Sequence, residues 1–277
     1  MKTFLRGWLL AFALLAPGLA SAAYSCTISS GGFSAIYVAT SPTTTIVQTS
    51  YTITCTRALS DATTMSYSVA ADNGANAQGT HNRAAFGASR IAYDLFKDSA
   101  CGTQWRGPQT ISGTLNFAGS TSASVTTQFW GCITASQTGL PAGTFTDSVN
   151  LTLTYGNLNS TATTAFPVSI TTNAMCNLTN APTDIVFNYV AFGAVVNAST
   201  SFGVTCTSTL PYTMALDATS GTVLGVSYTL ALSAASGTGT GALQTYSVNG
   251  SIAAGQPGTC ATGTCAASQP RTLTITY

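Results

Sequence analysis

The feature that most restricts the fold of this chain is a short cysteine-containing phrase that occurs twice. The phrase reads YTITCT at 51–56 and FGVTCT at 202–207. In each case an earlier cysteine stands about 30 positions upstream, Cys26 for the first phrase and Cys176 for the second. Two copies of one phrase with one spacing indicate two copies of one domain.

The correspondence between the two halves continues beyond the cysteines. The matching stretches are 66–80 with 211–225, 91–96 with 226–232, and 147–156 with 270–277. Within them apolar and polar residues alternate, and clusters of Gly, Ser and Asn lie between them. Because no segment after residue 22 repeats with a helical period, the sequence predicts an all-β fold of two tandem immunoglobulin-like sandwiches. The predicted boundaries are 23–160 for the N-terminal sandwich, 161–173 for a connecting segment and 174–277 for the C-terminal domain.

Residues 1–22 have the composition of a secretory signal. Lys2 and Arg6 precede an apolar run that begins at Trp8, and the small residues Ala20-Ser21-Ala22 follow as a cleavage site. The run is shorter than the roughly 18 apolar residues expected of a membrane span. We therefore expect an exported protein whose mature chain begins near Ala23.

Eight cysteines, an even number, predict disulfide bonds in an exported chain. Metal ligation is disfavoured because the chain has one histidine and no CxxC motif. The repeated spacing defines two of the pairs, and elimination leaves the other two. The expected pairs are Cys26–Cys55, Cys176–Cys206, Cys101–Cys132 and Cys260–Cys265.

The charge composition argues against several classes of function. Charged residues make up 5% of the chain, and the acidic ones are all Asp, so no basic patch for nucleic acid is expected. His81 is the only histidine, and no catalytic or phosphate-binding motif occurs. We expect no enzyme, no metal and no cofactor. Asp94 and Asp98, which flank Lys97, are more simply interpreted as a salt bridge or turn cap than as a metal site.

Three stretches carry a resemblance to a known family: AYDLFKDSACGTQW at 92–105, GLPAGTFTDSVNLTLTY at 139–155 and TLTITY at 272–277. They resemble the spore coat protein U domain, which is the pilin module of archaic chaperone–usher pili in Gram-negative bacteria. The second copy lacks the PAGTFTD stretch. Two tandem copies are similar to the two-domain tip adhesin of such pili and unlike the one-domain rod subunit.

The resemblance implies sandwiches that lack their last strand. In such pilins a strand from the N-terminal extension of the next subunit fills the gap, a form of β-augmentation called donor-strand complementation. Here Phe166, Val168 and Ile170 alternate ahead of Cys176. This pattern predicts a strand that folds back antiparallel to 147–155 and completes the first domain in cis. Pro167 is an obstacle because proline removes a ladder hydrogen bond, so an ordinary linker is the alternative.

The lengths of the two ends lead to a directional expectation. Only Ala23, Tyr24 and Ser25 separate the expected cleavage site from Cys26, and the sequence stops at Tyr277. With the resemblance, this implies a subunit that accepts a donor strand through its second domain and gives none, as at a fibre tip. The last strand would pair with a periplasmic chaperone and then with an adjacent pilin. Its core-facing residues would be Leu273, Ile275 and Tyr277.

A surface for attachment is expected at the free pole of the first domain. The connections predicted there lie near 57–63, 97–124 and 156–160. The candidate contact residues are Trp105, Ile111, Leu115 and Phe117, with core or strand positions as the alternative. The residues expected in the core are Phe33, Ile36, Tyr37 and Trp130.

The function that we expect is that of a fimbrial tip subunit, which mediates surface attachment and biofilm formation at the cell surface. Its partners would be a periplasmic chaperone, an outer-membrane usher, a strand-donating pilin and an abiotic or host surface. Two alternatives stay open. One is a secreted spore or cell coat protein, and the other is a carbohydrate-binding sandwich, for which Asp61 and Trp105 are thin support.

Overall fold

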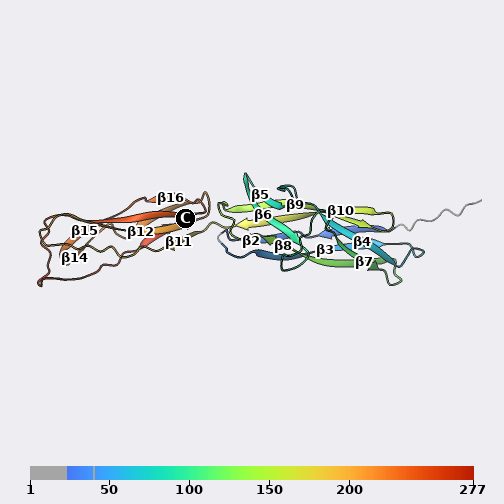
Figure 1. Cartoon of the computed structure of the whole chain (residues 1–277), viewed down its shortest axis with the longest axis horizontal. Coiled ribbons are helices and arrows are strands. Elements are labelled where there is room, and N and C mark those ends of the chain that lie inside the picture. The colour runs from blue at the N-terminus through green and yellow to red at the C-terminus, as the bar shows by residue number, and fades with distance from the viewer. Residues whose placement is uncertain (1–23, 40) are drawn as a thin grey trace, which may run out of the picture.

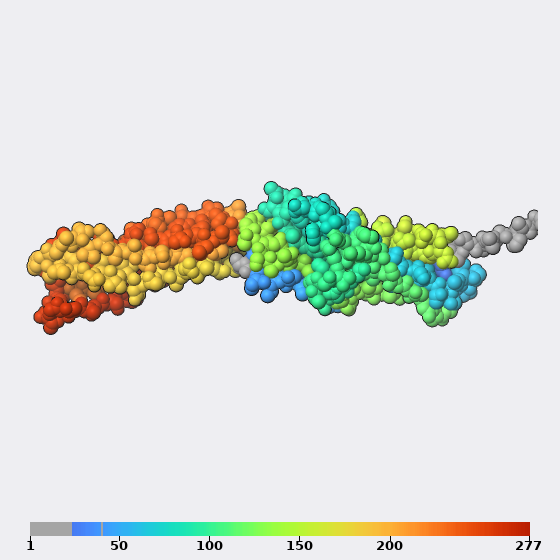
Figure 2. All heavy atoms as spheres, viewed as in Figure 1, coloured from blue at the N-terminus to red at the C-terminus, as the bar shows by residue number. Residues whose placement is uncertain are grey.

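The computed structural model describes residues 24–39 and 41–277, so the predicted signal at 1–22 lies outside the described range. No helix in this range is long and apolar enough to cross a membrane. The described chain forms two elongated all-β bodies that lie end to end (Figure 1). We call residues 24–172 domain 1 and residues 176–277 domain 2. Domain 1 is visibly the thicker of the two (Figure 2).

Domain 1 contains ten strands in which buried and exposed side chains alternate. The strands are β1 (Ser25–Ser30), β2 (Phe33–Tyr37), β3 (Thr45–Thr56), β4 (Thr64–Ala71), β5 (Asn82–Phe86), β6 (Ser89–Phe96), β7 (Ile111–Asn116), β8 (Ser122–Ile133), β9 (Gly143–Tyr155) and β10 (Ser160–Thr172). Their hydrogen-bonded order is β1-β3-β8-β6-β5-β9-β10-β2, and β4 pairs with both β7 and β9. The inner faces share one core, whose centre is aromatic: the Trp105 ring lies 5.7 Å from Tyr51 and 4.7 Å from Phe129.

Domain 2 contains eight strands, which are shorter and form two sheets. The strands are β11 (Cys176–Asn180), β12 (Val196–Cys206), β13 (Pro211–Leu216), β14 (Ser220–Val223), β15 (Val226–Leu232), β16 (Ser236–Thr238), β17 (Leu243–Ile252) and β18 (Leu273–Thr276). One sheet has the order β11-β12-β17-β15-β14, and the other has the order β16-β13-β18. A separate, smaller set of buried side chains lies between these sheets.

The four disulfides join the pairs that the sequence predicts. Cys26 lies directly opposite Cys55 in the β1–β3 ladder, and Cys176 lies directly opposite Cys206 in the β11–β12 ladder. The repeated phrase therefore marks the same structural position in both domains.

The bend between β1 and β2 leaves space for Pro167 of β10. Gly32, between β1 and β2, has φ +81°, and a Cβ there would collide with the ring and carbonyl of Pro167. Pairing between β10 and β2 begins one residue later, at Val168. The first half of β10 is therefore an edge strand in which a proline is tolerated.

The junction between the domains is short and hydrogen-bonded. Ser208 N donates to Leu140 O at 3.2 Å, and Leu140 is itself buried in domain 1. Thr172 Oγ1 donates to Pro141 O at 2.5 Å, where β10 leaves domain 1. The C-terminus lies near this junction, so β18 runs toward domain 1 (Figure 1).

Candidate functional site

The strand β10 occupies the gap between β9 and β2 in domain 1. It pairs antiparallel with β9, with Phe166 opposite Val149, and parallel with β2, with Val168 opposite Phe33. The side chains of Phe166, Val168 and Ile170 are buried in the shared core. By the hydrophobic scale each contributes about 1.5–3 kcal/mol. Domain 1 thus has a complete edge on this side, built from its own chain.

Hydrogen bonds identify the counterpart of β2 in domain 2. In domain 1 the Tyr37 hydroxyl donates to Thr134 O and accepts from Gln137 N, both at 2.9 Å. In domain 2 the Tyr189 hydroxyl donates to Gln256 O and accepts from Gln256 N. The side chain of each glutamine also hydrogen-bonds both backbone groups of the residue before a core tyrosine. For Gln137 this residue is Ala92, and for Gln256 it is Ser227. The segment that ends at Tyr189 therefore corresponds to β2.

A second set of bonds identifies β18 as the counterpart of β9. The Tyr93 hydroxyl donates to Asp147 Oδ2 at 2.7 Å, and the Tyr228 hydroxyl donates to Gln269 Oε1 at 2.7 Å. A second pair of bonds gives the same alignment of β18 with β9. Asp72 N donates to Asn150 O in domain 1, and Asp217 N donates to Thr272 O in domain 2. Residues of β9 therefore correspond to residues 122 positions later, for example 151 to 273 and 155 to 277.

Within the described residues nothing occupies the position of β10 in domain 2. The strand β18 pairs with β13 on one side only. The segment 184–190, which we call the A′ segment, belongs to no strand, and none of its backbone N–H groups donates a hydrogen bond to the described chain. We refer to β18 and the A′ segment together as the open edge.

The side chains along the open edge are apolar and incompletely covered. Ile185, Phe187 and Tyr189 are half-buried against the core, and they alternate with exposed residues. Leu273 and Ile275 are half-buried, whereas their counterparts Leu151 and Leu153 in β9 are fully buried. Alternating apolar side chains beside unpaired backbone are what an added strand requires.

One cation lies at the open edge. Arg271, just before β18, donates from Nη2 to Ser220 O at 2.8 Å, and its guanidinium lies 5.6 Å from the Tyr228 ring centre. Its Nε is buried and has no hydrogen-bond partner. A Cβ at Gly221 would collide with this group, so the glycine leaves space for it. The sequence analysis did not identify this residue.

The structure places the predicted pairing residues as follows. Leu273 and Ile275 point toward the core of domain 2, as predicted. Tyr277 is 58% exposed, so the prediction that it faces the core is wrong for the described chain. Its counterpart in domain 1, Tyr155, is buried where β4 and β10 flank β9.

The predicted contact residues are not surface residues, which corrects the sequence analysis. Trp105 is 1% exposed, and Leu115 and Phe117 are also buried, while Ile111 is half-buried. Trp105 N donates to Leu95 O at 2.7 Å and its indole Nε1 donates to Val69 O at 3.0 Å. These bonds turn the indole inward from its loop, because a buried N–H needs an acceptor.

The pole of domain 1 remote from domain 2 exposes two other apolar side chains. The Phe117 ring stacks on Tyr24 at 5.9 Å, and the Arg57 guanidinium lies 5.4 Å from the Phe117 ring centre. Around this layer Leu59 is 75% exposed and Leu158 is 69% exposed. Both lie in connections that the sequence placed at this pole, but the sequence analysis did not single them out.

One predicted core residue is also misplaced. In β2 the inward positions are Phe33, Ala35 and Tyr37, so Ile36 points outward and is 66% exposed. The error is one of strand parity, because adjacent residues of a strand face opposite sides. Trp130 is half-buried.

Several titratable side chains make local contacts within domain 1. Asp94 Oδ2 lies 2.8 Å from His81 Nδ1, and no group of three metal-ligating side chains occurs between residues 24 and 277, residue 40 aside. Backbone N–H groups of Gly102, Thr103 and Ala100 lower the pKa of Asp98, which caps its turn as expected. Burial raises the pKa of Tyr51 to about 12, and burial together with the Asp147 carboxylate raises the pKa of Tyr93.

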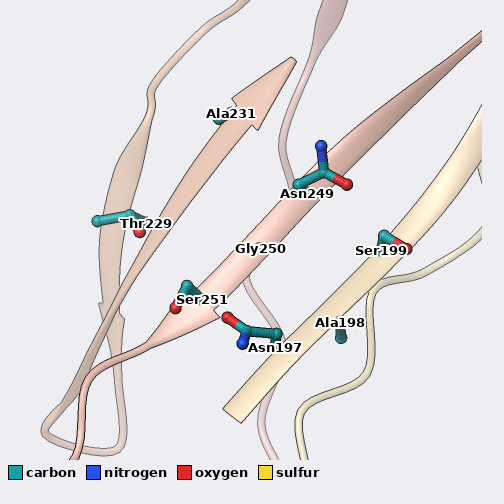
Figure 3. Close-up of a pocket in the computed structure, with 8 residues that line it drawn as sticks. All are labelled: Asn197, Ala198, Ser199, Thr229, Ala231, Asn249, Gly250 and Ser251. Atoms are coloured by element: carbon teal, nitrogen blue, oxygen red, sulfur yellow. The ribbon is translucent and has the colours of Figure 1, made fainter. Parts of the chain in front are cut away.

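A shallow hollow lies on the outer face of the β12-β17-β15 sheet (Figure 3). Its lining consists of small and amide side chains, without a charged or aromatic residue: Asn197, Ala198, Ser199, Thr229, Ala231, Asn249, Gly250 and Ser251. It offers neither a carboxylate nor a ring for stacking, so it lends no support to the carbohydrate-binding alternative.

Comparison with known proteins identifies the family. The model of the Spore Coat Protein U domain matches residues 11–152, and the chain belongs to this family. No curated protein matches the chain in sequence.

Three solved structures show similarity of fold at low sequence identity. A chain of the CsuC–CsuE chaperone–tip adhesion subunit complex from the archaic Csu pili of Acinetobacter baumannii is 13% identical, with 91% of this chain and 99% of that chain covered and a TM-score of 0.47. The CupB6 tip adhesin of Pseudomonas aeruginosa is 12% identical, with 92% and 94% covered and a TM-score of 0.43. The CooA pilin subunit of enterotoxigenic Escherichia coli is 11% identical, with 53% and 97% covered and a TM-score of 0.31.

Proposed function

We propose that this protein is the tip subunit of a chaperone–usher pilus, exported through the periplasm and attached to the fibre by a strand that the adjacent pilin inserts at the open edge of domain 2. A periplasmic chaperone would cover the same edge before an outer-membrane usher mediates the exchange. Family membership supports a pilin-type role. The observation that carries the proposal is the contrast between β9, covered by β10, and β18, which lacks such a neighbour among the described residues.

The geometry of domain 1 supports the direction of insertion. There β10 runs antiparallel to β9, parallel to β2, and leads directly into domain 2. A strand with the same geometry in domain 2 would run antiparallel to β18 and away from domain 1. The body of the strand donor would then lie beyond the outer end of domain 2, so that domain 1 points away from the fibre.

The remote pole of domain 1 is the proposed attachment surface. Exposed apolar side chains bind other apolar surfaces through the area they bury, without a specific pocket. Leu59 and Leu158 are exposed there. We expect the double variant Leu59→Ser and Leu158→Ser to reduce adhesion of piliated cells to an abiotic surface while pilus number is unchanged. The control is Leu178→Ser, because Leu178 is also exposed but lies in domain 2. Equal adhesion of the two variants would show that the remote pole of domain 1 is not the attachment surface.

The strand-insertion proposal is tested by supplying the strand. A copy of residues 156–172, which form the turn and β10 in domain 1, is appended after Tyr277 in the full-length protein. The expected result is a higher melting temperature for domain 2 and protection of the A′ segment from proteolysis. In the matched control, the copies of Val168 and Ile170 are replaced by Asn, which removes the inward apolar residues. An appended strand that stabilises no more than this control would contradict the proposal.

The position in the fibre is tested separately. Gold-labelled antibodies against domain 1 should mark only the ends of filaments on the producing cells. Label along the filament shaft would show a rod subunit. Label on cells without filaments would favour the alternative of a secreted coat protein.

A further inference from the structure

At one inward position the open edge carries a charged side chain where the completed edge of domain 1 carries an apolar one. Arg271 occupies the place of Val149, since the two strands correspond with a shift of 122 residues. Val149 is fully buried and lies directly opposite Phe166 of β10. The residue of an incoming strand that takes the place of Phe166 will therefore lie opposite Arg271, within about 4.5–5.5 Å between Cβ atoms.

The charge of Arg271 is not neutralised by the described chain. Arg271 is the only basic residue after Arg106 in the sequence, and it forms no ion pair with the chain between residues 24 and 277, residue 40 aside. Its Nε has no partner although the atom is shielded from water. Covering this edge with another strand would bury the guanidinium further, and a buried charge is costly unless it is paired.

We infer that the strand that completes domain 2 carries a carboxylate side chain at the position that Phe166 holds in β10, and that Arg271 selects for it. The inference rests on the proposed insertion of a strand at the open edge. A carboxylate at this position reaches the guanidinium across one strand spacing. It supplies the acceptor that Nε lacks, in a charge-assisted hydrogen bond.

The same residue would discriminate against β10 itself. A strand with Phe at this position would bury Arg271 without an acceptor for its Nε, whereas in domain 1 the Phe ring lies opposite the apolar Val149. Specificity of this kind comes from a penalty on the wrong partner as well as from attraction to the right one. Arg271 would thus favour a carboxylate-bearing strand over the β10 strand of another molecule, although both could be inserted.

The test uses the full-length protein with a copy of residues 156–172 appended after Tyr277. Three versions carry Phe, Glu or Gln at the copy of Phe166, and each is made with Arg271 and with Arg271→Val. The melting temperature of domain 2 is measured by calorimetry. With Arg271 we expect the Glu version to melt about 10 °C above the Phe version, with Gln in between. With Arg271→Val we expect the order of Glu and Phe to reverse.

The outcomes separate this inference from the proposed function. If no appended strand raises the melting temperature of domain 2, both the inserted strand and its charge preference are wrong. If all versions stabilise domain 2 but Phe equals or exceeds Glu with Arg271 present, only the role of Arg271 is overturned. The role of Arg271 is also overturned if the Gln version melts at the same temperature as the Glu version, or if the Glu version still melts above the Phe version in Arg271→Val.

Discussion

Domains 1 and 2 have the same strand arrangement around the disulfide, but the edge formed by β9 is covered by another strand and the edge formed by β18 is not. Both place a disulfide between the first two paired strands and a tyrosine–glutamine bond at the end of the β2 position. At this edge they differ because β10 covers β9, while β18 has no such cover among the described residues. The comparison locates the difference between the two edges in the presence or absence of one covering strand.

The difference extends into the core. Leu151 and Leu153 are fully buried in domain 1, whereas Leu273 and Ile275 remain half-buried in domain 2. The buried set of domain 2 is correspondingly small. Since stability is a small difference between large terms, we expect domain 2, which lacks the burial that one more strand provides, to be less stable than domain 1.

The largest expected effect comes from damaging β10. Phe166→Ala removes a fully buried ring that contacts Phe129 at 5.2 Å between centroids. We expect the free energy of unfolding of domain 1 to fall by about 3–5 kcal/mol, measured by urea titration. The transition of domain 2 should not change. Ile36→Ala, on the exposed face of β2, is the control. A loss confined to domain 2 would show that β10 is not part of the domain 1 core.

Removing the equivalent disulfides should show that domain 2 has the smaller free energy of unfolding. Loss of Cys26–Cys55 and of Cys176–Cys206 by Ala substitution should each cost about 3.5 kcal/mol, because the loops are 29 and 30 residues long. We expect domain 1 to remain folded at 25 °C and domain 2 to unfold, as judged by its near-ultraviolet circular dichroism. If both domains remain folded at 25 °C, the open edge lowers the free energy of unfolding of domain 2 only slightly.

The parallel tyrosine bonds offer a finer comparison. Tyr93→Phe leaves the buried Asp147 carboxylate without one donor, while Tyr228→Phe affects a neutral amide. The expected losses are about 1.5–3 kcal/mol in domain 1 and about 1 kcal/mol in domain 2, since bonds to charged groups are stronger. Thermal unfolding of the two variants measures both. Equal losses would show that the Asp147 carboxylate gains no more from this bond than the Gln269 amide does.

The fold was predictable because its signals are local. The duplicated cysteine phrase and the alternation of Phe166, Val168 and Ile170 each constrain a strand through spacing alone. The inward bonds of Trp105 were not predictable, because its acceptor, Val69 O, lies 36 residues away in the sequence. The sequence likewise does not distinguish Arg271 as special until the register of β18 against β9 is known.

The smallest expected effect concerns Asp98, which lies at the surface. Backbone N–H groups, first that of Gly102, lower its pKa below the ordinary aspartate value of 3.8. Because the folded pKa lies below the unfolded one, the stabilisation is present above pH 3.8 and is lost as the pH falls through the folded pKa. Asp98→Asn should therefore be slightly less stable than the wild type at pH 7, and this difference should disappear once the pH falls below the folded pKa of Asp98. A gap that does not change with pH would exclude this cause.

Amide hydrogen exchange measured by mass spectrometry tests the central contrast most directly. Peptides that cover β2 and β9 should exchange only through global unfolding of domain 1, while those that cover the A′ segment and β18 should exchange orders of magnitude faster. Appending the donor strand should slow the latter peptides and leave the former unchanged. Equal protection of both edges in the unmodified protein would contradict the account.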